Sequence, residues 1–410
     1  MNSNPEGSVP KTLRILFVDD EALILSMIPH VITHFRGDWK IETASSGRLG
    51  LERLANTQFD IVVSDLSMPG MNGMDFLSEV RDVCPGATRI MFSSHSDRES
   101  VLDCSPLIHQ FLPKPSSNEL LIATLERAAL VRTFLPETEI RDMVSRLEGI
   151  PSIPSVYAEL MEQLQSPETT ITEVATIVSR DFGMTSQILR TVNSAFFGLR
   201  RPTSNISDAI SHLGIETIKY LALSAGVFKE FRTRELGGLR VEPLWRHSLE
   251  TARLARELAN REHAGSKIAE DSFAAGLLHD IGKLILAGSY SERYAMAAEL
   301  ARSEGLPWIT AERKTFKCDH AEVGAYLLGL WGLPKPVVDA VRWHHFPLND
   351  SNDTFTPLTA VHAANVLSQC GSEEAMDVAR PEIDFLYIMK NCSAGAWNVW
   401  RHEYAESVAA

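Results

Sequence analysis

Short runs of apolar residues alternate with amphipathic segments over the first third of the chain, from Leu13 to about Arg132. This alternation is typical of a parallel β-sheet with helices on both of its faces. The runs that we interpret as strands cover residues 13–18, 40–43, 61–64, 89–92 and 109–112. The pattern therefore predicts an α/β domain built on a doubly wound sheet of five parallel strands.

Beyond residue 147 the strand pattern stops, and apolar residues recur at helical spacing, as in Val156, Leu160 and Leu164. Residues that favour turns interrupt these stripes at Pro151, Pro154, Pro167, Gly198, Pro202 and Gly214. Short helices with short connections are typical of a compact bundle, so we expect an all-α second domain. Before it, the amphipathic stretch from Leu120 to Leu130 predicts the last helix of the first domain, which we expect to couple the two domains.

The pattern divides the chain into five parts. We expect a loose tail at 1–11, the sheet domain at 12–132 and a linker helix at 133–146. The helical domain is predicted at 147–345, and a helical extension at 346–410 is predicted to pack on it. At 410 residues, with 44% hydrophobic and 22% charged residues, the chain has enough apolar material for two packed cores.

Charge and cysteine content narrow the function classes. The formal net charge of −14 disfavours nonspecific binding to nucleic acid, which depends on lysine and arginine, so DNA is not an expected partner. The five cysteines are scattered without a CxxC pair, which predicts neither a disulfide framework nor a thiolate zinc site and fits the cytoplasm. The apolar stretch 273–287 is interrupted by His279, Asp280 and Lys283, and we expect no membrane segment.

Carboxylates follow two of the predicted strands. Asp19, Asp20 and Glu21 come after the first strand, and Asp65 comes after the third. Aspartates at such positions often cap the following helix, but parallel strands bring their carboxyl ends to one sheet edge, which favours a shared site. Clustered carboxylates repel one another and are relieved by a hard cation such as Mg²⁺.

The fourth and fifth strands lead to Ser93 and Lys114, which add a hydroxyl and an ammonium at the same edge. An attacking aspartate, a metal, a lysine and a hydroxyl together suit a phosphoryl group.

In these motifs, residues 13–132 resemble the receiver domains of response regulators, which have the flavodoxin-like fold. The resemblance implies that Asp65 accepts a phosphoryl group from a histidine kinase. It also implies that Asp20, Asp65 and the backbone carbonyl of Ser67 bind Mg²⁺, and that Asp19 assists through water. Lys114 would pair with the phosphate, and Ser93 and Phe111 would form a switch.

Residues 147–345 resemble the HDOD output domain, a relative of the HD metal-dependent phosphohydrolases. The resemblance rests on Ile150, Pro151 and Pro154, on the segment 179–182, on Leu189, Asn193 and Ser194, and on Leu213 with Gly214. Phe182 stands where the family more often has proline, a departure that concerns the shape of a helix rather than chemistry.

A subset of the thirteen histidines has the residue types of an HD metal site: His247, His279 with Asp280, His320, and the pair His344 and His345. Imidazoles and carboxylates from separate helices can converge in the core of a bundle. The segment 279–283 also resembles the His-Asp-Ile-Gly-Lys motif of HD-type phosphodiesterases, in which two metals clamp a phosphate. Lys283 would stabilise that phosphate, and iron or manganese would be the metal.

Two departures argue against catalysis. His345 is followed by Phe346 and Pro347 and not by the Gly-Tyr-Pro signature of cyclic-dinucleotide phosphodiesterases. Asn365 stands where HD hydrolases carry a last aspartate ligand, and an amide has no negative charge to offer a second metal.

We therefore expect a phosphorelay response regulator whose HDOD domain is non-catalytic and acts through a protein partner. The alternative is a phosphohydrolase that acts on a cyclic dinucleotide or another nucleotide under receiver control. A receiver that signals without phosphate is a third hypothesis. The cognate histidine kinase, the downstream partner and a homodimer stay open at this point.

Overall fold

The computed structural model describes residues 12–94, 108–132, 155–164, 166, 168–193, 203–232, 234–369 and 383–409. The predicted tail at 1–11 and the predicted linker helix at 133–146 lie outside these residues, as do Ile150, Pro151, Pro154 and Ser194 of the HDOD resemblance. The chain divides into two compact units, whose first boundary along the sequence is at Ala158.

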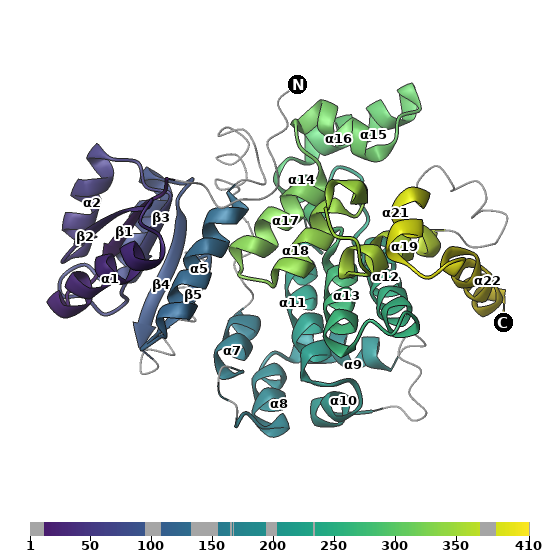
Figure 1. Cartoon of the computed structure of the whole chain (residues 1–410), viewed down its shortest axis with the longest axis horizontal. Coiled ribbons are helices and arrows are strands. Elements are labelled where there is room, and N and C mark those ends of the chain that lie inside the picture. The colour runs from purple at the N-terminus through teal and green to yellow at the C-terminus, as the bar shows by residue number, and fades with distance from the viewer. Residues whose placement is uncertain are drawn as a thin grey trace. The chain divides into compact units, whose positions relative to one another are not determined.

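The first unit contains a five-stranded parallel sheet with the order β2-β1-β3-β4-β5. Its strands are β1 (Arg14–Val18), β2 (Lys40–Ala44), β3 (Ile61–Ser64), β4 (Thr88–Ser94) and β5 (Gln110–Lys114), labelled in Figure 1. In the register of the sheet, Ile15 lies beside Ile41 of β2 and beside Ile61 of β3. The predicted doubly wound sheet is confirmed.

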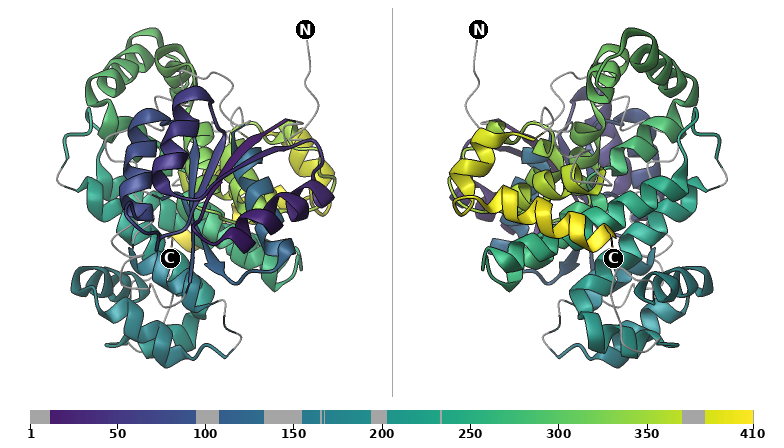
Figure 2. Two further views of the ribbon diagram at one scale, coloured as in Figure 1. Left: turned by 90° about the vertical axis from the view of Figure 1, so that its left-hand side faces the viewer. Right: turned by 90° about the vertical axis from the view of Figure 1, so that its right-hand side faces the viewer.

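Helices cover both faces of this sheet, as the left view of Figure 2 shows. One core cluster joins Ile15 and Phe17 to α1 (Ala22–Phe35) and α5 (Asn118–Val131). A second cluster joins Leu16 and Val18 to α2 (Gly47–Asn56) and α3 (Gly73–Val83). Because successive side chains of a strand point to opposite faces, a strand covered on both sides must be apolar throughout, which is why β1 has no polar alternation.

The edge strand β5 extends further than the sequence predicts. The predicted strand covers residues 109–112, yet β5 runs through Pro113 to Lys114. In the described sheet β5 pairs only with β4, and an edge strand tolerates proline because its outward groups need no partner. Lys114 is therefore held by the strand itself at the edge where ligands of such sheets bind.

The second unit is helical, as predicted. Its helices are α8 (Ile171–Ser179), α9 (Phe182–Val192), α10 (Ile206–Leu213), α11 (Ile215–Phe231), α12 (Val241–Arg261), α13 (Ser266–Leu278), α14 (Ile281–Ser289), α15 (Ser291–Glu304), α16 (Trp308–Phe316), α17 (His320–Leu330), α18 (Lys335–Trp343), η2 (Pro347–Asn349), α19 (Pro357–Gln369), α21 (Phe385–Asn391) and α22 (Ala396–Ala409). The helices α7 (Ser155–Gln163) and α17 each include a unit boundary, because Tyr326–Leu333 is grouped with the first unit.

The centre of the helical unit is formed by α12, α13 and α19, which pack against one another. Small residues make this close packing possible. A Cβ atom at Gly276 of α13 would lie 2.7 Å from the Cα atom of Ala252 of α12. The apolar stretch 273–287, which begins in α13, thus lies in the core of the unit.

Local sequence explains where several of these helices begin. Thr170 and Glu173 form a capping box at the start of α8. The side chain of Asp181 accepts a hydrogen bond from the backbone N–H of Met184 (2.9 Å), so α9 begins at Phe182. Phe182 is the first residue of this helix, the position at which proline is most favoured, which accounts for the proline that the family more often has there.

Gly73 offers a test of how tightly the loop after Asp65 is packed. A Cβ atom at Gly73 would lie 2.1 Å from the backbone oxygen of Asp65. We predict that Gly73→Ala lowers the free energy of unfolding of the receiver by about 1–3 kcal/mol, the usual effect of overpacking. Urea unfolding followed by hydrogen exchange of β3 amides would measure it. Gly37→Ala is the control, since its Cβ would meet only the Thr33 oxygen at 3.5 Å, and equal effects of the two variants would contradict the prediction.

Candidate functional sites

The carboxyl ends of β1, β3 and β5 bring a lysine and three carboxylates together. The Nζ atom of Lys114 lies 2.6 Å from Asp19 Oδ2 and 2.9 Å from Asp65 Oδ2. It also lies 3.5 Å from Oε1 of Glu21. Asp19 and Asp65 are buried, whereas Glu21 is exposed. The convergence that the strand ends predict is therefore present in the structure.

Backbone groups fix the two buried aspartates. Oδ1 of Asp65 accepts a hydrogen bond from the N–H of Leu66 (2.7 Å), and Oδ1 of Asp19 accepts one from the N–H of Glu21 (2.9 Å). In each aspartate the other oxygen, Oδ2, faces Lys114. Burial raises the pKa of Asp19, although Lys114 opposes this. Burial by itself lowers the pKa of Lys114, but the hydrogen bonds and charges of Asp19 and Asp65 outweigh it and raise that pKa.

The donor set at this edge fits a hard divalent cation. One oxygen of each of Asp19, Glu21 and Asp65 lies within 4.8 Å of the others, and carboxylate oxygens are the ligands that Mg²⁺ takes. Asp20, the residue for which the receiver resemblance implies direct Mg²⁺ binding, is exposed and is not in this group. The structure places Glu21 beside the pocket instead, and no signal in the sequence distinguishes these neighbouring acids.

The two residues of the predicted switch lie on neighbouring strands. Ser93 is buried near the end of β4, and Phe111 of β5 pairs with Met91. Phe111 is partly buried and packs against the core cluster that includes Phe76 of α3. The role of both residues in a switch stays a prediction.

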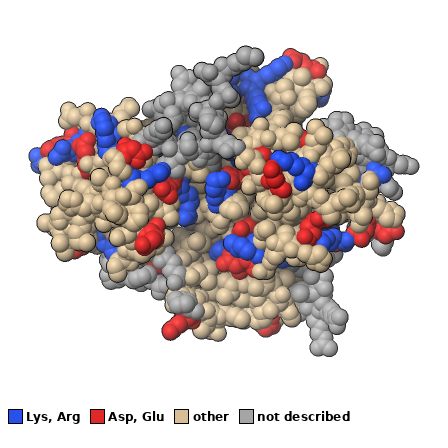
Figure 3. Space-filling view, viewed as in Figure 1, with Lys and Arg blue, Asp and Glu red and all other residues tan. Residues whose placement is uncertain are grey.

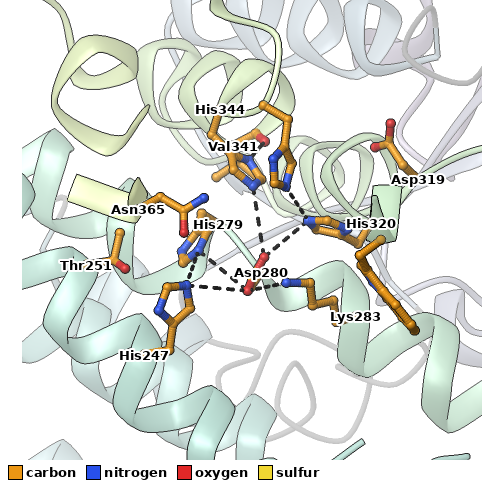
Figure 4. Close-up of polar contacts among 12 residues, drawn as sticks. His247, Thr251, His279, Asp280, Lys283, Asp319, His320, Val341, His344 and Asn365 are labelled. Atoms are coloured by element: carbon orange, nitrogen blue, oxygen red, sulfur yellow. Dashed lines mark hydrogen bonds and ion pairs between the residues drawn. The ribbon is translucent and has the colours of Figure 1, made fainter. Parts of the chain in front are cut away.

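In the helical unit a fully buried carboxylate lies at the centre of the histidine cluster (Figure 4). Asp280, which precedes α14, has Oδ2 at 3.5 Å from His279 Nε2 and at 3.8 Å from His247 Nε2. Its Oδ1 lies 3.2 Å from His320 Nε2 and 4.0 Å from His344 Nε2. The carboxylate thus presents one oxygen to each of two histidine groups.

Two further predicted residues complete this site. His345 Nε2 lies 3.1 Å from His320 Nε2, and Lys283 donates to Asp280 Oδ2 at 2.7 Å. His320, His344 and His345 each place a nitrogen within 4.8 Å of the others, as do His247 and His279 with an oxygen of Asp280. The predicted histidines and Lys283 are therefore gathered around this carboxylate.

Hydrogen bonds between Nδ1 and backbone carbonyl oxygens orient two of the imidazoles. His279 Nδ1 lies 2.8 Å from the carbonyl oxygen of Gly276, and His344 Nδ1 lies 2.7 Å from that of Val341. A carbonyl only accepts, so Nδ1 carries the proton and a neutral ring leaves Nε2 free as a ligand. His344 Nε2 is buried and has no hydrogen-bond partner among the described residues. This arrangement fits a metal ion held by the Nε2 atoms.

Burial and nearby charges keep most of these histidines neutral and keep Asp280 ionised. Burial lowers the pKa of His279 to about 4, and burial lowers the pKa values of His344 and His345 well below the usual range. Burial alone would raise the pKa of Asp280, but the charges of His279 and Lys283 and the hydrogen bond from His320 hold it well below its ordinary value. Neutral imidazoles around a carboxylate anion are the forms that bind a cation.

Glu312 is a residue of this site that the sequence did not reveal. It is fully buried on α16, where Oε2 lies 2.6 Å from His320 Nδ1 and accepts from the backbone N–H of His320 at 3.0 Å. Its other oxygen accepts from Trp308 Nε1 at 2.7 Å. Glu312 belongs to no motif, and a glutamate eight residues before a histidine has no signal without the packing of α16.

Asn365 lies where the sequence places it, on α19 beside His247. Its Oδ1, which the sequence offers as a metal ligand, accepts a hydrogen bond from Gln369 Nε2 at 3.0 Å. On the same helix, Ser368 Oγ lies 3.2 Å from His247 Nδ1 and so helps to orient that ring. Ser368 is a second contact of this site that no sequence motif predicts.

The glycine of the segment 279–283 is Gly282, and close packing of the backbone requires it. A Cβ atom at this position would lie 2.0 Å from the backbone oxygen of His320. The glycine therefore allows the start of α14 to approach the start of α17 closely enough for Asp280 to face His320.

Comparison with known proteins assigns both units to families. The response regulator receiver domain matches residues 15–126, and the HDOD domain matches residues 150–347. The response regulator MprA of Mycobacterium ulcerans is 30% identical over 167 residues, which cover 40% of this chain and 70% of that protein. The chain belongs to the response-regulator family and combines an N-terminal receiver domain with a C-terminal HDOD domain.

Two further matches extend the comparison. An uncharacterized protein of Treponema pallidum is 26% identical over 244 residues, covering 58% of this chain and 47% of that protein. A crystal structure of an HDOD domain protein of unknown function from Geobacter sulfurreducens has a TM-score of 0.51 at 24% identity, covering 64% of this chain and 87% of that one, and shows the shared fold. The chain spans only 34% and 26% of the length of two other curated relatives.

Two surface properties bear on the partner classes. Among the described residues, no helix has the length and apolar character needed to cross a membrane. On the face shown in Figure 3, the described lysines and arginines are scattered among aspartates and glutamates and do not form one broad basic patch.

The His320–Glu312 pair predicts a pH dependence in metal-free protein. Burial by itself lowers the pKa of His320, but the charge of Glu312 outweighs it and raises that pKa to about 9, above an unfolded value of about 6.5. The stability contributed by protonated His320 is then fully present below about pH 6.5 and is lost as the pH rises through about 9.

Urea unfolding of EDTA-treated protein between these pH values would measure this loss. Glu312→Gln should remove most of it, because the isosteric amide carries no charge. Glu304→Gln is the control, since Glu304 is exposed and pairs with Lys314. An unchanged pH dependence in Glu312→Gln would show that the pair is not its source.

Proposed function

We propose that this response regulator accepts a phosphoryl group on Asp65 from a histidine kinase, and that the phosphorylation state controls a non-catalytic HDOD domain that acts through a protein partner. The observation that carries the proposal is the buried contact of Lys114 with both Asp65 and Asp19. An ammonium beside the acceptor carboxylate suits transfer of a group with three anionic oxygens.

In the proposed reaction, an oxygen of Asp65 forms the new bond to phosphorus while the bond between phosphorus and the donor histidine nitrogen breaks. Lys114 pairs with a phosphoryl oxygen as charge moves onto it. Asp19, Asp65 and Glu21 would hold Mg²⁺, with Asp20 and the Ser67 carbonyl as the ligands that the family resemblance implies. When bound, the ion neutralises the acceptor carboxylates and the incoming phosphoryl oxygens.

The proposed switch uses the neighbouring strands β4 and β5. Ser93 would donate its hydroxyl to the phosphoryl group, and Phe111 would follow it inward. A ligand shifts a two-state equilibrium only through different interactions with the two states, and the bond from Ser93 to phosphate supplies such a difference. The histidine kinase is the partner that a receiver domain implies, while the downstream protein, a homodimer and a cytoplasmic location remain proposals.

Labelling with acetyl phosphate tests the acceptor. Asp65→Asn should abolish incorporation of phosphate, because an amide oxygen is a poor nucleophile and lacks the charge that binds Mg²⁺. Intact-mass spectrometry would count the phosphates. Asp82→Asn is the matched control, since Asp82 is an exposed carboxylate of the same domain, and it should label like the parent. Labelling of Asp65→Asn at the parental level would refute the assignment and favour a receiver that signals without phosphate.

A second candidate function is a metal-dependent phosphohydrolase acting on a cyclic dinucleotide or another nucleotide. The observation that favours it is Asp280, whose two oxygens face two histidine groups as a carboxylate shared between two metals would. Iron or manganese would be held by the Nε2 atoms, and Lys283 would pair with substrate phosphate. We favour the regulatory function because Asn365 replaces the last aspartate and its Oδ1 is already bonded to Gln369.

Elemental analysis of the purified protein separates metal binding from hydrolysis. If the site holds metal, His279→Ala and Asp280→Ala should lose it, whereas Glu312→Gln should weaken binding by about 10–100-fold, as expected for a residue that orients a ligand. His402→Ala is the control, because His402 is exposed on α22. Turnover of phosphodiesters that disappears in His279→Ala and Asp280→Ala but not in His402→Ala would overturn the non-catalytic assignment.

A further inference from the structure

A cavity of about 420 Å³ lies in the helical unit between α9, the end of α11 and the first half of α12. None of its lining residues belongs to the histidine site or to the receiver pocket. Its volume is in the range of small-molecule sites, which is about 300–1,000 Å³. The cavity is therefore large enough for a ligand of its own.

The charged groups that line this cavity are mostly cationic. Arg190 of α9, Arg232 after α11 and Arg246 of α12 contribute guanidinium groups, and among the described lining residues Glu242 alone contributes a carboxylate. Glu242 pairs with Arg246 at 3.6 Å. Among the described residues, no carboxylate pairs with Arg190 or Arg232. In a chain with a net charge of −14, a cavity with this excess of cations attracts anions.

A buried amide points to the same kind of ligand. Gln187 of α9 is 6% exposed and lines the cavity. Its Nε2 is buried and has no hydrogen-bond partner among the described residues. Buried donors in folded proteins almost always have an acceptor, so an acceptor from a bound ligand would satisfy Gln187.

Trp245 supplies an apolar wall to the cavity. It is 7% exposed, and its ring packs edge to face on Phe228 at 4.9 Å, which fixes its position. Guanidinium groups bind phosphate through paired hydrogen bonds, and a fixed indole ring suits a planar apolar group. Phosphate and a planar ring occur together in a nucleotide.

We propose that this cavity binds a nucleoside monophosphate. Arg190, Arg232 and Gln187 bind its phosphate, and its base packs against Trp245. The HDOD domain then receives a small-molecule signal in addition to the signal from the receiver. Binding at this cavity requires neither phosphorylation of Asp65 nor a metal ion at Asp280.

Isothermal titration calorimetry on the full chain tests the proposal, with GMP, AMP, guanosine and inorganic phosphate as probes. EDTA in the buffer removes Mg²⁺ and transition metals and so suppresses metal-dependent phosphate binding at Asp65 and at Asp280. We expect GMP or AMP to bind more tightly than inorganic phosphate, and guanosine to bind more weakly than GMP.

The variants locate the binding. The double variant Arg190→Gln with Arg232→Gln should raise the dissociation constant at least about tenfold, because charge-assisted hydrogen bonds to phosphate are lost. Gln187→Leu should weaken binding in the same direction. Arg302→Gln is the control, because Arg302 is exposed on α15 outside the cavity, and circular dichroism would show that each variant is folded.

Three outcomes would overturn the proposal. The first is that neither GMP nor AMP binds at millimolar concentration. The second is that the folded double variant binds as tightly as the parent, which would place the ligand elsewhere. The third is that inorganic phosphate binds as tightly as GMP, which would exclude the base-binding role of Trp245.

Discussion

Carboxylates buried away from water need cationic or hydrogen-bonding partners, and this constraint organises both units of the protein. Removing an ionised carboxylate from water is costly unless its charge is neutralised nearby. Asp65 and Asp19 meet the ammonium of Lys114, and Asp280 meets Lys283 and a group of histidines. Each cluster also has the ligand types of a metal site: carboxylate oxygens in the receiver domain, and imidazole nitrogens with a carboxylate in the helical unit.

The two folds satisfy this constraint by different routes. In the receiver domain, parallel strands end at one edge of the sheet, so residues far apart in sequence meet without any special contact between helices. In the HDOD domain, the groups come from α12, α14, α17 and α18, and their meeting depends on how closely these helices pack. The close approach at Gly282 shows the difference, because one added methyl group there would separate Asp280 from His320.

The histidines are oriented as ligands of a metal ion would be, but Asn365 stands where HD hydrolases carry an aspartate ligand. Hydrogen bonds from Nδ1 atoms to Gly276 and Val341 turn the Nε2 atoms toward Asp280, and Glu312 does the same for His320. Such supporting contacts are what a bound metal requires from the surrounding protein. The amide of Asn365, in contrast, is bonded to Gln369 and brings no charge. This combination is the reason that the proposed function of the domain is regulatory rather than hydrolytic.

The sequence by itself determined the fold class, the five strands and the residues at the strand ends, including Asp65 and Lys114. Short apolar runs and helical stripes are local patterns, and a parallel sheet brings its strand ends together at one edge, so those features follow from residue order alone. The sequence also identified the residue types of the histidine site.

Only the tertiary structure decided which groups support that site and which do not enter the receiver pocket. Glu312 and Ser368 act because α16 and α19 pack beside the histidines, and Asp20 is exposed while its neighbour Asp19 is buried. The cavity at Gln187 likewise joins residues of α9 and α12 with Arg232, which follows α11. These outcomes depend on the packing of side chains from distant segments, which no local pattern of apolar and polar residues specifies.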